Sequence, residues 1–244
     1  MNYVAALTDF FKSPKWMMNL LLAGLLCLIP ILGWMVVLGW LVIGFWGRED
    51  DKMETFPDFD LKNFSTYLEK GLWPFLVILA VSIGGGIVIG ILVGVFGGVG
   101  HAVLGHKGAL SGMLDLFLAL VNLALRIALM FITVPVALRA MILQDFVKAF
   151  DLPFVKKFVS LMWLESLITS IVCGVAACIL IPIGLIALCV GVGLSFALLQ
   201  FMSTHLYKQL YALYLSRGGE AIPLSPKLSG SDTPPPPPVA PAAV

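Results

Sequence analysis

Long apolar runs separated by short polar segments form the dominant pattern of this chain. Four runs stand out, at residues 16–46, 72–99, 113–138 and 158–202. A helix rises about 1.5 Å per residue, so roughly 20 apolar residues are needed to cross the hydrocarbon core of a bilayer. Each run reaches that length with few charges in it. The pattern therefore predicts an all-α integral membrane protein.

The last and the first of these runs are too long for a single span. The last is about twice the required length, and we expect two helices that turn at Pro182 and Gly184, because proline cannot donate a backbone hydrogen bond and glycine tolerates turn conformations. The first run is divided by Pro30 and Gly33. It is either one tilted helix kinked at Pro30, or a tight hairpin of two short helices that thins or re-enters the bilayer.

The positions of lysine and arginine favour the hairpin. Cytoplasmic loops of membrane proteins carry an excess of these residues. Six helices with both termini in the cytoplasm leave only Lys107 outside, with Arg126 inside a helix, whereas five helices also place Lys12 and Lys15 outside. We therefore predict about six transmembrane helices, with both proline turns on the outer face and both termini in the cytoplasm.

The polar segments complete this picture of a single membrane domain at residues 1–217. Residues 1–12 are amphipathic and predict a short helix in the membrane interface. The acidic segment 47–71 is interpreted as a solvated cytoplasmic loop. Residues 218–244 contain five consecutive prolines and predict a disordered tail.

Composition agrees with a membrane protein and argues against several functions. Of the 244 residues, 60% are hydrophobic and 12% are charged, which is too few charges to cover a soluble globule. A net charge of +1 without a basic patch argues against a nucleic-acid partner. The four cysteines form no C-x-x-C pair, so we expect no metal site and no cofactor. No catalytic constellation converges on either surface, and we expect no enzymatic activity.

Glycines recur at a four-residue spacing in the second run. This spacing places three overlapping G-x-x-x-G motifs on one helix face, a pattern typical of close helix contact in membranes. Either a helix of the same chain or a second copy would match the glycines, and the sequence leaves both alternatives open. They are Gly86, Gly90, Gly94 and Gly98.

Polar residues form a stripe along the third run. Their spacings of seven, four and seven place Asp115, Asn122, Arg126 and Thr133 on one helix face. A charge near the bilayer centre requires a partner. We expect Arg126 to pair with Glu165 in the following run, either as a structural ion pair or as part of a substrate or proton path.

Several motifs of the chain resemble those of one family. They are SPKW at 13–16, LIPILG at 28–33, FPDFDLKNFSTYLEKGL at 56–72, VPVALR at 134–139, DFVKAFD at 145–151 and YKQLY at 207–211. Over about residues 3–215 the chain resembles DUF4013, an uncharacterised prokaryotic family of multi-pass membrane proteins. A looser similarity extends to the membrane domain of some glycerophosphodiester phosphodiesterases. The resemblance implies a fold and a location in the cytoplasmic membrane, and no functional residues.

Two functional interpretations follow from these features. The first is a non-enzymatic scaffold or accessory protein that organises lipids, with membrane lipids, a second copy or another membrane protein as partners. The alternative is a small-molecule or ion transporter that uses the polar stripe around Arg126. Transporters often contain inverted repeats. Here both proline turns are expected on the outer face, which favours the first interpretation.

Overall fold

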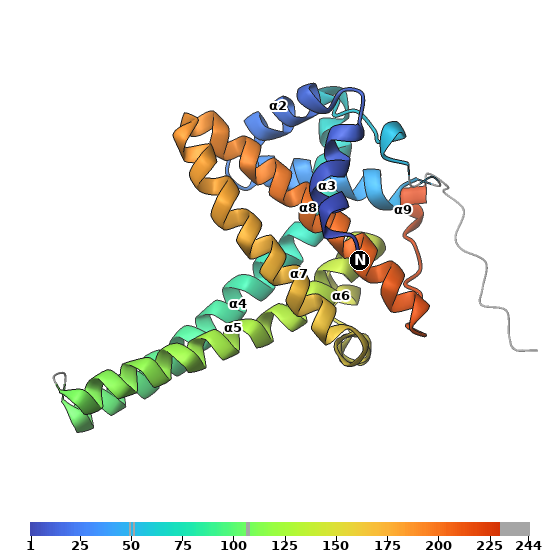
Figure 1. The fold of residues 1–244 in the computed structure, drawn as a ribbon. Coiled ribbons are helices and arrows are strands. Elements are labelled where there is room, and N and C mark those ends of the chain that lie inside the picture. The colour runs from blue at the N-terminus through green and yellow to red at the C-terminus, as the bar shows by residue number, and fades with distance from the viewer. Residues whose placement is uncertain (49, 51, 106–107, 230–244) are drawn as a thin grey trace, which may run out of the picture.

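The computed structural model describes residues 1–48, 50, 52–105 and 108–229, except for the side chains of residues 188, 189 and 229, and its regular elements in this part of the chain are all helical. Short α- and 3-10 segments connect five longer helices of at least 15 residues and the shorter α2 (Figure 1). The elements are α1 (Tyr3–Thr8), η1 (Asp9–Lys12), α2 (Trp16–Cys27), α3 (Leu32–Trp46), η2 (Met53–Thr55), η3 (Leu61–Asn63), α4 (Phe64–Leu104), α5 (Ala109–Leu143), α6 (Phe146–Ala149), α7 (Leu152–Ile186), α8 (Leu188–Ser216) and α9 (Pro226–Ser229).

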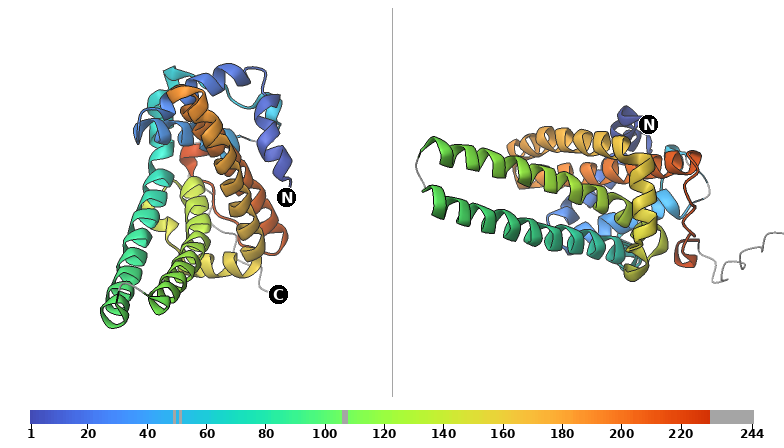
Figure 2. Two further views of the ribbon diagram at one scale, coloured as in Figure 1. Left: turned by 60° about the vertical axis from the view of Figure 1, so that its left-hand side comes forward. Right: turned by 90° about the horizontal axis from the view of Figure 1, so that it is seen from below.

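The six main helices are arranged as three consecutive pairs: α2 with α3, α4 with α5, and α7 with α8. The turns of all three pairs lie toward one end of the molecule, and the N-terminus and α9 lie toward the other (Figures 1 and 2). The α4–α5 pair extends farthest and projects away from the other helices as a two-helix arm. We call this pair the arm.

Four helical stretches are long and apolar enough to cross a bilayer: Leu61–Leu104, Ala109–Leu143, Phe146–Ile186 and Val190–Ser216. The first apolar run forms two helices separated at residues 28–31, and not one kinked helix. With 12 and 15 residues, α2 and α3 are about 18 and 22 Å long, shorter than a hydrocarbon core of about 30 Å. The molecule thus has four full-length candidate spans and one short pair.

The expected turn at Pro182 and Gly184 is wrong by a few residues. Helix α7 continues through both positions to Ile186, and the chain turns at Ala187. Gly184 serves close packing instead, since a Cβ placed there would lie 2.6 Å from the carbonyl oxygen of Gly191 in α8. Proline is tolerated within membrane helices when neighbouring groups satisfy the backbone.

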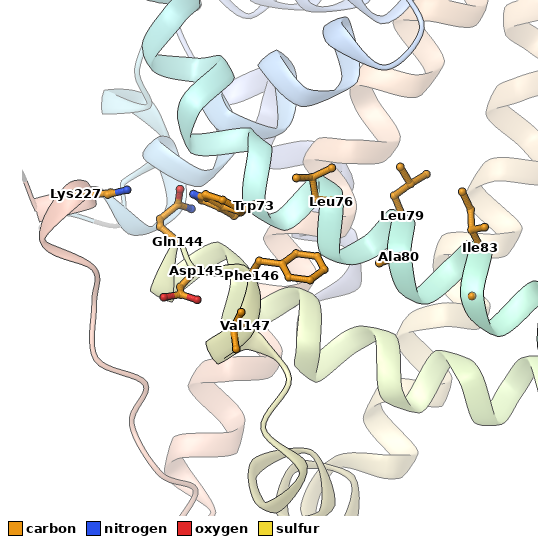
Figure 3. Close-up of a pocket in the computed structure, with 11 residues that line it drawn as sticks. Trp73, Leu76, Leu79, Ala80, Ile83, Gln144, Asp145, Phe146, Val147 and Lys227 are labelled. Carbon is orange, nitrogen blue, oxygen red and sulfur yellow. The ribbon is translucent and has the colours of Figure 1, made fainter.

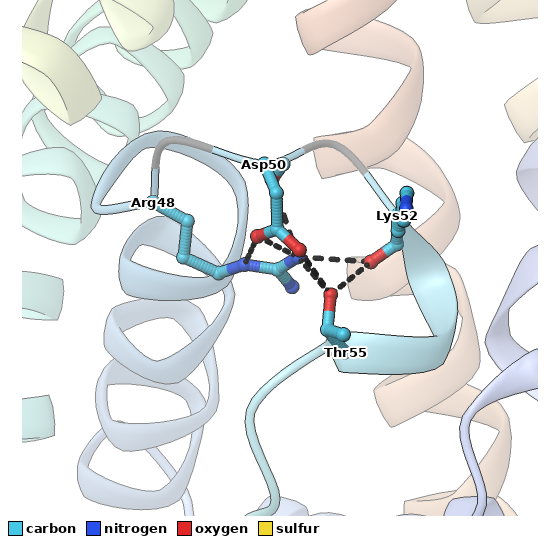
Figure 4. Close-up of polar contacts among 4 residues, drawn as sticks. All are labelled: Arg48, Asp50, Lys52 and Thr55. Atoms are coloured by element: carbon cyan, nitrogen blue, oxygen red, sulfur yellow. Dashed lines mark hydrogen bonds and ion pairs between the residues drawn. The ribbon is translucent and has the colours of Figure 1, made fainter.

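The acidic segment 47–71 is folded onto the bundle, contrary to the expectation of a solvated loop. Met53, Phe56 and Phe59 are buried in the main core cluster. The buried side chain of Asn19 accepts a hydrogen bond from the backbone N–H of Phe59 at 2.9 Å. The start of the segment is closed by a polar cluster in which Arg48 and Thr55 donate to Asp50, and Arg48 also donates to the carbonyl oxygen of Lys52 (Figure 4). These hydrogen bonds hold the pKa of Asp50 below its usual value, the one from Thr55 contributing most.

The N-terminal segment packs on the bundle through only part of its apolar face. The Phe10 ring is 4% exposed and lies 4.9 Å from the Phe201 ring in α8. Val4, Leu7 and Phe11 are exposed. Together with Met1, which is also exposed, these side chains are available to a membrane interface.

The C-terminal segment is ordered farther than its composition predicts. Ile222 and Leu228 are buried in the main core cluster. The backbone N–H of Ser225 donates to the carbonyl oxygen of Ile142 at 3.0 Å. The expectation of disorder from residue 218 is therefore wrong for residues 218–229, and residues 230–244 lie outside the described part of the chain.

Candidate functional site: a polar groove beside the arm

A groove runs along α5 where the arm meets α7 and α8. Its volume is about 330 Å³. Helix α5 contributes most of the wall, and single residues reach it from α7 and α8. We call it the Arg126 groove. It is lined by Ser82, Gly86, Arg126, Leu129, Met130, Thr133, Val134, Ser170 and Tyr207.

Arg126 is exposed at this groove and has a neutral neighbour. Its Nε donates to Oδ1 of Asn122, one helical turn away, at 2.7 Å. No carboxylate among the described residues lies within ion-pair distance of the guanidinium, so its charge is not neutralised by that part of the chain. The side chain is therefore positioned by Asn122 and directed at the groove.

The expected pair between Arg126 and Glu165 is wrong. Glu165 instead pairs with Arg217 at the end of α8, with an N–O distance of 2.5 Å. Arg217 also donates to the carbonyl oxygen of Leu161 at 2.7 Å, beside a kink in α7 where Met162 has φ −130° and ψ 15°. Glu165 therefore belongs to the end of the bundle that carries the termini.

The other members of the stripe are divided between two places. Asp115 lies near the tip of the arm, where its carboxylate is 3.0 Å from Nε2 of His101 on α4. Thr133 lines the groove, and its hydroxyl donates to the carbonyl oxygen of Leu129 at 2.9 Å. The stripe thus supplies Asn122, Arg126 and Thr133 to one site, while Asp115 holds the two helices of the arm together.

Comparison with known proteins identifies the family. The family model described as "Protein of unknown function (DUF4013)" matches residues 22–203. The chain belongs to this family. Neither the curated proteins nor the solved structures contain a match to it. The DUF4013 region includes the groove residues on α4, α5 and α7, whereas Tyr207 and Arg217 follow its end.

The repeated glycines of this DUF4013 protein do not pack within the chain. A Cβ at Gly86, Gly90, Gly94 or Gly98 would meet nothing within 4 Å. The face of α4 that contacts α5 includes Gly97, the residue before Gly98, since a Cβ at Gly97 would lie 3.2 Å from Cδ1 of Leu118 in α5. Of the two alternatives, packing inside the monomer is therefore wrong for these four glycines.

Other glycines make the closest helix contacts in the bundle. Gly39 of α3 and Gly71 of α4 face each other, and a Cβ at Gly71 would lie 1.8 Å from the carbonyl oxygen of Met35. Gly33 is not a turn residue, since it lies in the first turn of α3 against the carbonyl oxygen of Leu26. Pro30 does lie in the turn between α2 and α3. None of these glycines shows a G-x-x-x-G pattern that could identify its partner.

A second, larger cavity of about 810 Å³ lies beside the start of the arm (Figure 3). Its wall is mainly apolar, and Gln144, Asp145 and Lys227 form its polar end. A backbone hydrogen bond from Lys148 lowers the pKa of Asp145. Within the described part of the chain, no three His, Cys, Asp or Glu side chains are grouped to hold a metal ion.

The Glu165–Arg217 pair makes a first prediction. Glu165→Leu alone should lower the thermal stability of the detergent-solubilised protein. The guanidinium of Arg217 would lose its ion-pair partner and would no longer be held beside the kink in α7. Glu165→Leu combined with Arg217→Leu should recover part of the loss, and Arg126→Leu should not rescue Glu165→Leu. A rescue by Arg126→Leu would show that the ion pair is the one expected from the sequence.

Proposed function

We propose that this protein is a non-enzymatic, multi-pass protein of the prokaryotic cytoplasmic membrane that acts as a scaffold or accessory protein and organises lipids or a partner within the bilayer. The exposed apolar surface of the arm carries this proposal. Val103, Met113 and Phe96 are 77%, 67% and 66% exposed, and the glycine face of α4 is uncovered. Soluble proteins rarely expose apolar patches of this extent, and such patches mark interaction surfaces.

The proposed topology places six helices in the membrane, four crossing it and two entering part-way. The lengths of α2 and α3 support the shallower pair. An even number of crossings leaves both termini on one side, and the excess of Lys and Arg outside the long apolar runs supports the cytoplasm as that side.

Cysteine accessibility tests this topology. In a variant lacking the four native cysteines, Ala187→Cys should react with a membrane-impermeant thiol reagent added to intact cells, because the α7–α8 turn faces outward. Leu32→Cys should react slowly, and Ser216→Cys only after the membrane is permeabilised. Equally rapid labelling of the cysteines at positions 32 and 187 would establish six full crossings. Labelling of the cysteine at position 216 in intact cells would show that the termini lie outside.

The uncovered glycine face fits a second copy of the chain as one partner. Glycines at four-residue steps let two helix backbones approach closely. In the same cysteine-free background, Gly94→Cys should form a disulfide-linked dimer on mild oxidation of membranes. Gly112→Cys is the matched control, because its position is equally open but lies on α5. Equal cross-linking at both positions, or none at Gly94→Cys, would argue against a dimer through this face.

The transporter remains the second candidate because Arg126, half-way along α5, lines a polar groove. A transporter exposes its site alternately to the two sides of the membrane. Ser170→Cys would then react from both sides, whereas a scaffold gives reaction from one side at most.

A further inference from the structure

The guanidinium of Arg126 is the starting observation. A charge within the hydrocarbon region is costly unless it is paired or reaches water. Within the described part of the chain, the three acidic groups of the arm and of α7 are already engaged: Glu69 with Lys70, Asp115 with His101 and Glu165 with Arg217. Among the residues that the structure describes, Arg126 bonds only to the neutral Asn122. An anion from outside the chain would complete this site.

The groove supplies further hydrogen-bond donors for such an anion. Ser82, Ser170 and Tyr207 line it from three different helices. None of these hydroxyls makes a hydrogen bond to another described residue. Together with the free nitrogens of Arg126 they form a set of donors, and donors of this kind bind phosphate or carboxylate oxygens, most strongly where a guanidinium contributes.

The shape and walls of the groove indicate where the anion comes from. The remaining walls are apolar, formed by Leu129, Met130 and Val134. Arg126 itself is exposed on the side of the arm, whose neighbouring side chains Leu120 and Leu123 are 57% and 56% exposed. A volume of about 330 Å³ is at the lower limit of ligand pockets, so it suits a headgroup and not a whole lipid.

We propose that the Arg126 groove binds the anionic headgroup of a bilayer lipid, with the headgroup phosphate at Arg126 and the acyl chains extending along the exposed surface of the arm. This inference rests on the proposed membrane location and gives the lipid-organising role a site. The headgroup enters sideways from the bilayer, because the groove is open beside the apolar arm. A small phosphate monoester headgroup fits the donor set, whereas a headgroup with a bulky cation brings a second positive charge to Arg126.

Photolabelling of the reconstituted full-length protein tests the site. The protein is placed in phosphatidylcholine vesicles that contain a trace of photoreactive phosphatidic acid, and labelled peptides are mapped by mass spectrometry. Labelling of α5 and α7 peptides should fall about tenfold in Arg126→Gln, as expected for loss of a charge-assisted hydrogen bond. Lys156→Gln is the matched control, since it removes one exposed positive charge elsewhere and should label as the native protein does.

A second pair of variants leaves the charge in place and blocks the space. Gly86→Leu adds a side chain that fills the groove, and Gly112→Leu adds the same side chain to the arm away from it. Apart from the adjoining backbone of its own helix, neither new Cβ would meet a described atom within 4 Å. Gly86→Leu should reduce the labelling severalfold, and Gly112→Leu should leave it unchanged. This comparison decides the matter if Arg126→Gln does not fold.

Three results would overturn the proposal. One is equal labelling of the native protein and Gly86→Leu, and another is equal labelling by a photoreactive phosphatidylcholine. The third is displacement of the probe by millimolar inorganic phosphate, which would assign the site to a soluble anion. Flotation of the protein with the vesicles is measured separately. If the protein floats but its labelling does not depend on the groove, only the lipid site is refuted. If the protein does not float, the proposed membrane location is refuted as well.

Discussion

Replacing Gly71 by leucine is expected to prevent the protein from folding. Helices α3 and α4 cross here backbone to backbone: a Cβ at Gly71 would lie 1.8 Å from the carbonyl oxygen of Met35, and a Cβ at Gly39 would lie 1.7 Å from that of Tyr67. The atoms in the way belong to the backbone, so a rotamer change cannot relieve the overlap. We expect destabilisation beyond about 4–5 kcal/mol, the range reached only when the packing of a core is broken.

The measurement is the yield of monodisperse protein after detergent extraction, followed by thermal unfolding. Gly94→Leu is the matched control, because the same substitution is made on the same helix at a position where a Cβ meets nothing within 4 Å. It should preserve the folded monomer and affect at most the assembly of copies. A Gly71→Leu protein as stable as Gly94→Leu would show that the α3–α4 crossing is not held at this distance.

The existence of the helices could be predicted because it depends on hydrophobicity along the chain. An apolar run of sufficient length has one stable form in a bilayer, and the runs 72–99 and 113–138 lie inside α4 and α5. The division of the first run was also predictable, since Pro30 interrupts it and leaves about fifteen residues on either side. Helix ends were less predictable, because α4 and α5 continue well beyond their apolar runs.

The partners of individual residues could not be predicted, because they depend on the rotation of one helix against another. A step of one residue turns a helix face by about 100°. This single step separates Gly98, which is open, from Gly97, which contacts Leu118. The same limit applies to Glu165: its place in an apolar run could be read from the sequence, but the approach of Arg217 from the end of α8 could not.

The candidate site was predicted in part. Arg126 and Thr133 line one groove and Asn122 bonds to Arg126, because helical spacing within one element is reliable. Ser82, Ser170 and Tyr207 come from three other helices, and no local pattern connects them with Arg126. Only a general signal could have suggested them: a Ser, Thr or Tyr within an apolar run is a candidate neighbour for a charged side chain at a similar depth in another run.

Replacing Phe56 by alanine is the second change with a large expected effect. Phe56 lies in the acidic segment, yet the residue is only 6% exposed. The centroid of its ring lies 5.4 Å from that of Trp40, 5.2 Å from that of Phe45 and 5.7 Å from that of Phe201. It also fills the space above Gly44, where an added Cβ would meet the ring. Truncation leaves a cavity that α3 and α8, both held by other contacts, cannot close.

We therefore expect Phe56→Ala to lower the free energy of unfolding by about 3–5 kcal/mol, the usual cost of removing a buried phenylalanine ring. Phe96→Ala is the control, since that ring is 66% exposed on the arm and should cost little. Both are measured by thermal unfolding in one detergent. If the two variants melt together near the native temperature, the acidic segment is a solvated loop, as its charges suggest. If only Phe56→Ala melts early, the segment is part of the core, and its aromatic residues matter more to the fold than its carboxylates.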